Sequence, residues 1–294
     1  MFIRRLLGAA LALLIVAAGA AAAAPLRLGL VTDVHAHDTN SPNQHAVMVN
    51  YAERLGAFTQ AMNDWAADAV IELGDLVNGA FVTGAPLGDP ARIPGILAAV
   101  VEALDAFRGP RHFVLGNHDV YDLSKVEFLA GVGSSSTFSS FDLGAYHIVL
   151  LDAQYTKAGG DVAHVGWMVQ GTIPSLELEW LRQDLAAAIR PTIVFIHQPL
   201  DVAFELEAGG PSISNNEAVR DVLSGSGRVI AVFQGHSHES RHAVIDGVHY
   251  VTLAAMIDRD ESVPPTWAAV TLDPEARTVR VDGAGLQESL EFSY

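Results

Sequence analysis

Five short segments of this chain place side chains that can bind metal directly after runs of apolar residues. The segments are "LVTDVH", "VIELGD", "FVLGNHD", "VFIH" and "AVFQGHSH", and their donors are Asp33, His35, Asp75, Asn117, His118, Asp119, His197, His236 and His238. Carboxylate and imidazole donors without thiolate suit small divalent or trivalent ions. A lone His after a strand is usually a capping or surface residue, but five such endings favour a shared site for two ions.

The apolar runs predict the strands that must position these donors. We expect strands over 26–32, 69–73 and 111–115, and two more over "TIVFIH" and "RVIAVFQGH". Helical spacing of apolar residues predicts a helix from Tyr51 to Trp65, and two further helices are expected over 96–107 and over 176–189, the last with Ser175 as its cap. Alternating helices and strands indicate an α/β protein, in which ligands bind beyond the carboxyl ends of the strands. All five endings are therefore expected at one rim.

Turns complete the expected arrangement. "TFSSFDLGAYHIVLLD" predicts a hairpin turning near Leu143-Gly144, and the tail from Arg241 onward is typical of β-hairpins. Glycines at 74, 116 and 235 precede donor residues, and we expect each to let the backbone turn sharply so that the donor points into the rim.

Together the five segments resemble the motif set of the calcineurin-like metallophosphoesterases. The matching residues run in order from Asp33 to His238: Asp33-x-His35, Gly74-Asp75-x-x-Asn78, Gly116-Asn117-His118-Asp119, His197 and Gly235-His236-x-His238. The resemblance implies a four-layer α/β fold with two mixed β-sheets packed face to face and helices outside. It places that domain over 25–294.

The resemblance also implies how the residues divide. It assigns two metal-binding sets with one bridging ligand, namely Asp33, His35 and His238, then Asn117, His197 and His236, and Asp75 between them. His118 would lie over the substrate as a catalytic residue, with Asp119 beside it. Asn78 stands where purple acid phosphatases carry a Tyr ligand, which disfavours that branch.

Elementary chemistry agrees with this division. Two ions about 3.5–4 Å apart can share a water whose pKa falls from about 15.7 to about 7, so a bridging hydroxide can attack phosphorus at neutral pH. Two divalent ions bring about +4 and Asp33, Asp75 and the hydroxide remove about three, which leaves a positive site for an anionic phosphate. His118 is expected to protonate the leaving oxygen or to stabilise the transition state, and Asp119 to fix its tautomer.

The substrate class rests on a looser likeness. "GNHDVYDLS", "LELEWLRQDL", "FQGHSHES" and the tail "VHYVTLAAMIDRDESVPPTWAAVTL" are most similar to manganese-dependent ADP-ribose/CDP-alcohol diphosphatases. The likeness favours manganese, with iron, zinc or cobalt as alternatives, and small phosphate esters or anhydrides such as nucleoside diphosphate derivatives. Segments 79–94 and 159–174 are expected to flank the rim. Within the second, His164, Trp167 and Gln170 line either a substrate pocket, with Trp167 stacking on a base, or an ordinary packed loop.

Other functions fit the same residues. The chain could be a broad-specificity exported phosphomonoesterase, a mononuclear zinc hydrolase, or a metal- or nucleotide-binding protein without catalysis. The remaining histidines outside the motifs have simpler expectations: His112, His147 and His249 pack or lie at the surface, and His45 and His242 belong to no motif. His37 is close enough to His35 to lie beside the metals, and this remains open.

Composition narrows the partners. The chain has 294 residues, a formal net charge of −17 at pH 7 and no Cys. Because nucleic-acid binding depends on Lys and Arg that displace counterions from phosphates, we expect a small phosphorylated substrate and no nucleic acid. The protein must be stable without disulfides.

The N-terminal segment "MFIRRLLGAALALLIVAAGAAAAAPLRLGL" has an Arg pair, an apolar stretch and small residues. This pattern predicts a secretory signal peptide over 1–24, cut between Ala20 and Ala24. The alternative is a retained anchor, since residues 6–24 are nearly long enough to span a bilayer. With cleavage, we expect an exported protein, periplasmic or extracellular, that has no membrane contact.

Overall fold

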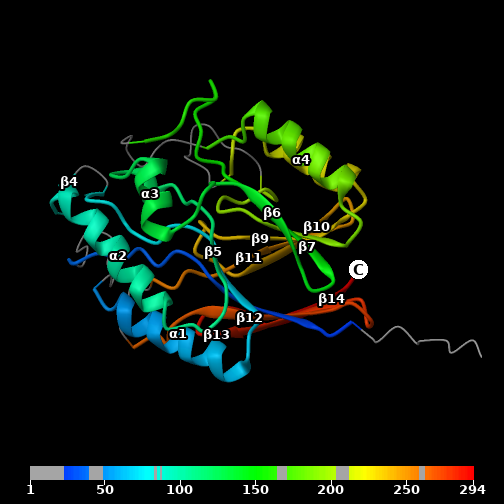
Figure 1. Ribbon diagram of the computed structural model, residues 1–294, viewed down its shortest axis with the longest axis horizontal. Helices are drawn as coiled ribbons and strands as arrows, with labels where there is room; N and C mark the ends of the chain where they lie inside the picture. Colours follow the sequence, from blue (N-terminus) through cyan, green and yellow to red (C-terminus); the bar gives the residue numbers. More distant parts are fainter. Residues whose placement is uncertain are drawn as a thin grey trace, which may run out of the picture.

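The computed structural model describes residues 23–39, 49–82, 85–86, 88–163, 171–202, 212–257 and 262–294. Within these residues, two six-stranded mixed sheets pack face to face and helices cover both outer faces (Figure 1). The predicted four-layer fold is confirmed.

The first sheet has the strand order β14-β13-β12-β1-β2-β5. Its strands are β1 (Leu26–Val31), β2 (Ala69–Glu72), β5 (Arg111–Phe113), β12 (Trp267–Asp273), β13 (Thr278–Ala284) and β14 (Leu290–Ser293). Because β1, β2 and β5 are parallel, their carboxyl ends share one rim. The outer face is covered by α1 (Tyr51–Trp65), α2 (Ile93–Leu104) and α3 (Lys125–Val132).

The second sheet has the order β10-β11-β9-β8-β7-β6. Its strands are β6 (Ser139–Leu143), β7 (Tyr146–Leu150), β8 (Thr192–Phe195), β9 (Val229–Gln234), β10 (Arg241–Ile245) and β11 (Val248–Thr252). The strands β7, β8, β9 and β11 are parallel, so this sheet also directs its strand ends to one rim. Its outer face is covered by α4 (Ser175–Ala187) and α5 (Asn216–Gly225).

The described residues also form short elements that belong to neither six-stranded sheet. The strands β3 (Phe81–Val82) and β4 (Ala85–Pro86) pair with each other, and two 3₁₀ turns are η1 (Pro90–Arg92) and η2 (His118–Val120). The turn η2 begins directly on a motif residue, so the chain changes from strand to tight helix within the predicted site.

The core explains why the central strands are almost wholly apolar. All residues of β2 and β8 are buried, because each strand has the other sheet on one face and helices on the other. Between the sheets, Phe195 and Phe233 stack with ring centroids 5.6 Å apart. Burial on both faces holds the strands in place and so fixes where their carboxyl ends emerge.

Most predicted elements are confirmed. The helix over 51–65 has the expected bounds, and the hairpin turns at Gly144, with Leu143 paired to Tyr146. The tail forms the expected hairpins β10–β11, β12–β13 and β13–β14. The second helix begins three residues earlier than expected, at Ile93. The predicted cap at Ser175 is wrong: Pro174 is the N-cap, without a side-chain hydrogen bond, and Ser175 is already helical.

Sequence reasoning did not predict α3 and α5, although both carry a signal. Ser124 and Glu127 form a reciprocal capping box at the start of α3, and the spacing S-x-x-E is visible in the chain. In α5, Val219, Val222 and Leu223 are buried at helical spacing. Both helices are short, which weakens their periodic pattern.

Several expectations fall on residues outside the described part of the chain. These include nearly all of the predicted signal peptide, His45, and His164, Trp167 and Gln170. Among the residues that the structure describes, no helix is both long enough and apolar enough to cross a membrane.

Candidate metal centre

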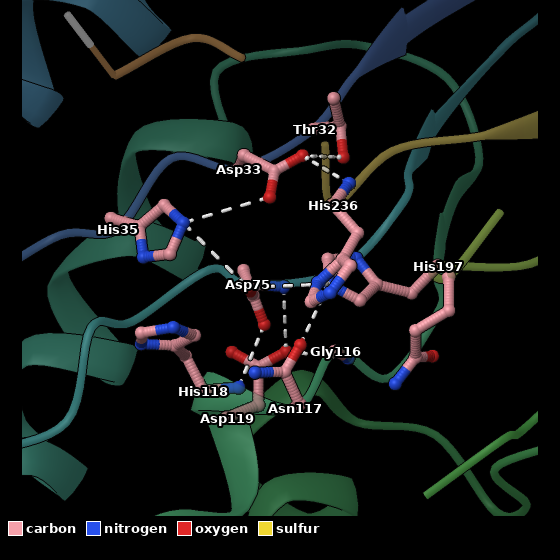
Figure 2. Close-up of polar contacts among 12 residues, drawn as sticks. Thr32, Asp33, His35, Asp75, Gly116, Asn117, His118, Asp119, His197 and His236 are labelled. Carbon is pink, nitrogen blue, oxygen red and sulfur yellow. Dashed lines mark hydrogen bonds and ion pairs between the residues drawn. The ribbon is translucent and has the colours of Figure 1, made fainter. Parts of the chain in front are cut away.

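The predicted donors converge at one rim of the two sheets. Three sets have ligand atoms that all lie within 4.8 Å of one another, and they are Asp33, His35 and His238, then Asp75, His197 and His236, and also His35, Asp75 and His118. Asn117 joins the second set, since its Oδ1 lies 3.2 Å from His197 Nε2. Figure 2 shows the side chains that it labels among these donors pointing toward a common space, from the first sheet (Asp33, His35, Asp75, Asn117 and His118) and from the second (His197 and His236).

Five donors reach this space from left-handed backbone conformations. Their φ angles are 53° for Asp33, 46° for His35, 61° for Asp75, 68° for His236 and 61° for His238. A non-glycine residue in this region costs about 1–3 kcal/mol and persists only where its surroundings hold it. Backbone bonds do so here, from Asp33 N to Gly74 O at 3.0 Å and from His35 N to Asp75 O at 2.9 Å.

The three motif glycines act in two different ways. Gly74 has a φ of 100°, which confirms the expected sharp turn. For Gly116 and Gly235 the expectation is wrong, because neither has positive φ and both are needed for close packing. A Cβ on Gly116 would lie 2.2 Å from Asp75 N, and one on Gly235 would lie 2.1 Å from Thr32 Oγ1.

The first donor set leaves one carboxylate oxygen ready for a cation. Asp33 Oδ2 accepts hydrogen bonds from Thr32 Oγ1 at 2.7 Å and from His236 N at 2.9 Å. Asp33 Oδ1 is buried without a hydrogen bond, although His238 Nε2 lies 3.2 Å away. The Nε2 atoms of His35 and His238 are 3.1 Å apart.

The second set converges in the same way. His197 Nε2 lies 3.2 Å from Asp75 Oδ2 and 3.2 Å from His236 Nδ1. The same oxygen of Asp75 is 3.6 Å from His35 Nε2, in the first set. One carboxylate oxygen of Asp75 therefore faces both donor sets.

These separations test whether the residues fit metal ions. Ligand atoms bound at about 2.1 Å to one ion, in tetrahedral or octahedral arrangement, lie about 3.0–3.4 Å apart. The 3.1 and 3.2 Å contacts match that range. Burial lowers the pKa of His236 to about 3, so the ring of His236 is neutral as a metal ligand must be. Burial acts in the same direction on His197, but the charge of Asp75 outweighs it and raises the pKa of His197 to about 9, so a bound cation would have to displace that proton. The donor sets fit two divalent ions.

His118 is oriented by a group that the motif analysis did not assign to it. Its Nδ1 lies 2.8 Å from the Asn78 carbonyl oxygen, and because a carbonyl can only accept, Nδ1 carries the proton. Its backbone N donates to Asp75 Oδ1 at 2.8 Å. Burial lowers the pKa of His118 to about 4, against the opposing charge of Asp75. Nε2 is thus the ring atom left to meet a substrate.

The expected role of Asp119 as the group that orients His118 is wrong. Its carboxylate instead accepts three backbone N–H bonds, from Asp75 at 2.9 Å, Val77 at 3.1 Å and Gly116 at 2.9 Å. Burial, with the nearby charge of Asp75, raises the pKa of Asp119 to about 7. Asp119 therefore joins the ends of β2 and β5 and positions Asp75 through the backbone.

Two supporting residues were not predicted in these roles. Asn78 places its Oδ1 3.0 Å from His35 Nδ1, so it orients one donor by its side chain and His118 by its carbonyl. The Tyr121 hydroxyl accepts from Asn117 Nδ2 at 3.0 Å, which turns Asn117 Oδ1 toward His197. Both residues are visible near the motifs, but their partners depend on the fold.

The other histidines follow the simpler expectations where the structure describes them. His37 is buried and its Nδ1 contacts Thr39 and Asp38, and no described hydrogen bond joins it to a metal donor, so its contacts do not support a place beside the metals. His112 stacks on Phe141 and His249 on Phe292, with centroids 4.3 and 3.8 Å apart.

Known proteins share this sequence pattern and fold. The family model for the calcineurin-like phosphoesterases matches residues 26–240. A manganese-dependent ADP-ribose/CDP-alcohol diphosphatase of Arabidopsis thaliana is 22% identical, over 93% of this chain and 99% of its own length. The crystal structure of a dimetal phosphatase from Danio rerio has a TM-score of 0.74 at 19% identity, with 92% of this chain and 99% of that chain covered. A purple acid phosphatase from yellow lupin seeds has a TM-score of 0.60 at 14% identity, covering 92% of this chain and 54% of that chain.

Proposed function

Because this chain belongs to the calcineurin-like phosphoesterase family and is a hydrolase of phosphoester bonds, we propose that it works with two divalent ions, preferably manganese. Its proposed substrates are small phosphate esters or anhydrides, including nucleoside diphosphate derivatives such as ADP-ribose or CDP-alcohols. The observation that carries the proposal is Asp75, whose Oδ2 faces both donor sets. The relative from Arabidopsis thaliana, named for manganese and for these diphosphates, supports the metal and the substrate class.

The donors divide into two sites and a bridge. Asp33, His35 and His238 would hold one ion, Asn117, His197 and His236 the other, and Asp75 would touch both. When bound, two such ions supply Lewis-acid activation of the phosphate and a water whose pKa falls to about 7. The donor residues would hold the two ions in place. Five of these residues have the left-handed backbone conformation that directs their side chains toward the site.

His118 is the proposed catalytic side chain beyond the metals. The Asn78 carbonyl holds the Nδ1 proton, so Nε2 is the ring atom that can act at the leaving oxygen. Because burial lowers the pKa of His118 to about 4, the ring is neutral at pH 7, and Nε2 would have to gain a second proton before it could deliver one. The ring lies edge-on to His35, with centroids 4.5 Å apart, which places it beside the first donor set.

We also propose that the protein is exported after loss of residues 1–24 and that it has no nucleic-acid partner. The Arg pair and apolar stretch at the N-terminus support export. The net charge of −17 supports a small substrate over a polyanion.

Metal analysis with a substrate panel tests the proposal. The protein, stripped of metal and reloaded with Mn²⁺, is expected to hold two ions per chain and to cleave ADP-ribose and CDP-choline faster than an aryl monoester. Faster cleavage of monoesters would contradict the proposed diphosphatase activity and would indicate a broad-specificity phosphomonoesterase. Two bound ions without turnover on any substrate would indicate a binding protein, and one ion per chain a mononuclear hydrolase.

A further inference from the structure

A buried pair of glutamines connects the two sheets beside the candidate metal centre. Gln154 Nε2 donates to Gln198 Oε1 at 2.8 Å, and Gln198 Nε2 donates back to Gln154 Oε1 at 3.1 Å. Gln154 Nε2 also donates to the Leu115 carbonyl at 3.3 Å. Gln154 and Gln198 follow β7 and β8 of the second sheet, whereas Leu115 follows β5 of the first sheet. The pair therefore bridges the sheets at their shared rim.

The segments that the pair joins are those that deliver two metal donors. Leu115 precedes Asn117 by two residues, and Gln198 follows His197 directly. Asn117 Oδ1 and His197 Nε2 lie 3.2 Å apart although they come from different sheets. A rigid connection between these two segments is needed to keep that distance.

The pair is well placed to be rigid. Gln154 is 0% and Gln198 3% exposed, so neither amide exchanges its partner for water. Gln154 N donates to Asp152 Oδ1 at 2.7 Å, which fixes the backbone. Gly171 closes the pair from another side, since a Cβ there would lie 3.2 Å from Gln198 Nε2. Buried amides are costly unless paired, and a reciprocal pair satisfies both without adding charge.

We propose that Gln154 and Gln198 are positioning residues that set the distance between Asn117 and His197, and with it the affinity for one of the two divalent ions. The proposal rests on the dinuclear centre proposed above. Among the described hydrogen bonds, none links the pair to Asp33, His35 or His238. Because the pair instead holds the segments that lead to Asn117 and His197, its effect should fall on the ion held by Asn117, His197 and His236.

Calorimetric titration of the metal-stripped, full-length protein with Mn²⁺ tests this selectivity. The wild-type chain is expected to bind two ions. In Gln154→Met, one ion should bind as in the wild type and the other about 10–100-fold more weakly, the usual loss when a group that orients a metal ligand is removed. Gln198→Glu keeps the acceptor for Gln154 Nε2 and the contact with Leu115, so its selective loss should be smaller than that of Gln154→Glu.

Two further variants separate positioning from stability. Gln154→Met combined with Gln198→Met leaves neither side-chain amide unpaired, although the Leu115 carbonyl loses its donor, so its melting temperature should recover in part toward wild type while the selective loss of affinity remains. If the Gln154→Met variant does not fold, the double variant provides the affinity measurement in its place. Gln60→Met, at an exposed glutamine on α1 that donates to Asp64, should bind both ions as the wild type does.

The outcomes separate this proposal from the function it rests on. Wild-type protein that binds fewer than two ions would overturn both. Two ions in the wild type and unchanged affinities in the folded double variant would overturn the positioning role alone. Equal weakening of both ions would also overturn it, because it would show a general loosening of the rim.

Discussion

The two sheets meet at one site but contribute different chemistry to it. The rim of the first sheet supplies the carboxylates Asp33 and Asp75 and the amide of Asn117, together with the imidazoles of His35 and His118. The rim of the second sheet, which follows β8 and β9, supplies only imidazoles, from His197, His236 and His238. The carboxylates of the two donor sets thus come from one side of the centre, and the second sheet contributes imidazoles from the other side.

The two rims are also held by different groups. In the first sheet, the carboxylate of Asp119 binds three backbone N–H groups. In the second, Gln154 pairs with Gln198, and Gln234 accepts from Leu200 N at 3.0 Å and donates to Thr252 Oγ1 at 2.9 Å. The carboxylates that take part here, Asp152 and Asp201, are paired with Lys125 and Arg241.

Carboxylates that lie close together at the first rim make each other's negative charge unfavourable. Burial beside Asp75 raises the pKa of Asp119 to about 7, so charge on Asp119 is disfavoured in the absence of a cation. The fully buried Gln234 carries no charge of its own, and the buried carboxylate to which it donates, Asp201, is neutralised by Arg241. We infer that the first rim depends on bound cations for its stability more than the second rim does.

The largest effect is expected from the bridge between the rims. Asp75→Ala removes the oxygen that faces both donor sets, so both ions and nearly all activity should be lost. Asp75→Asn keeps the shape of the side chain and serves as its charge control. Metal content by mass spectrometry and turnover are the measurements. A variant that kept two ions and normal turnover would contradict the assignment of Asp75.

A smaller effect is expected from a first-rim residue that is not a proposed metal ligand. His118→Ala should keep both ions but lower turnover by about 10²–10⁴, the range for general acid–base groups. Substrates with good leaving groups should lose less, because they need little protonation. Equal losses for all leaving groups in a series of aryl esters would exclude the acid role and leave electrostatic stabilisation.

The supports of the two rims can be compared directly. Asp119→Ala removes a carboxylate that accepts three backbone bonds and should lower the unfolding free energy by about 3–5 kcal/mol, whereas Gln234→Met should lower it by about 1–3 kcal/mol. Urea unfolding of metal-free and Mn²⁺-loaded protein measures both. Manganese should enlarge the difference in unfolding free energy between wild type and Asp119→Ala. An identical loss with and without metal would contradict the inference that the first rim depends more on bound cations than the second.

The smallest effect is expected away from the rim, where His147 on β7 joins Asp142 on β6 and Asp184 on α4, at 2.9 and 2.8 Å. Burial lowers the pKa of His147, but hydrogen bonds to Asp184 and Asp142 outweigh it and raise the pKa above 6.5. A raised pKa means that the contribution to stability is complete below about 6.5, the unfolded value, and is lost as pH rises through the folded pKa.

Urea midpoints between pH 5 and 9 measure this contribution. The wild type should lose a small part of its stability across that range relative to His147→Gln. His112→Gln is the matched control of opposite sign, since burial lowers the pKa of His112. Parallel pH profiles for wild type and His147→Gln would show that the two ion pairs contribute nothing.

Local sequence was enough to predict the donors and most elements. Each donor follows its own apolar strand within a few residues, as His197 follows β8, so strand and donor are read from the same short segment. Burial on both faces makes these strands nearly continuous apolar runs, which is a strong signal. The short helices α3 and α5 were missed because eight or ten residues carry too little periodicity.

Only the tertiary structure decided how those donors are held. Asp119 lies next to His118 in the chain, yet its carboxylate turns to the backbone of Asp75, 44 residues away. Gln154 and Gln198 are also 44 residues apart, and nothing in their own segments marks them as partners. The donors' identities are local because chemistry resides in side-chain types. Their orientations are not local, because a buried polar group takes whichever partner the packed sheets bring within hydrogen-bonding distance.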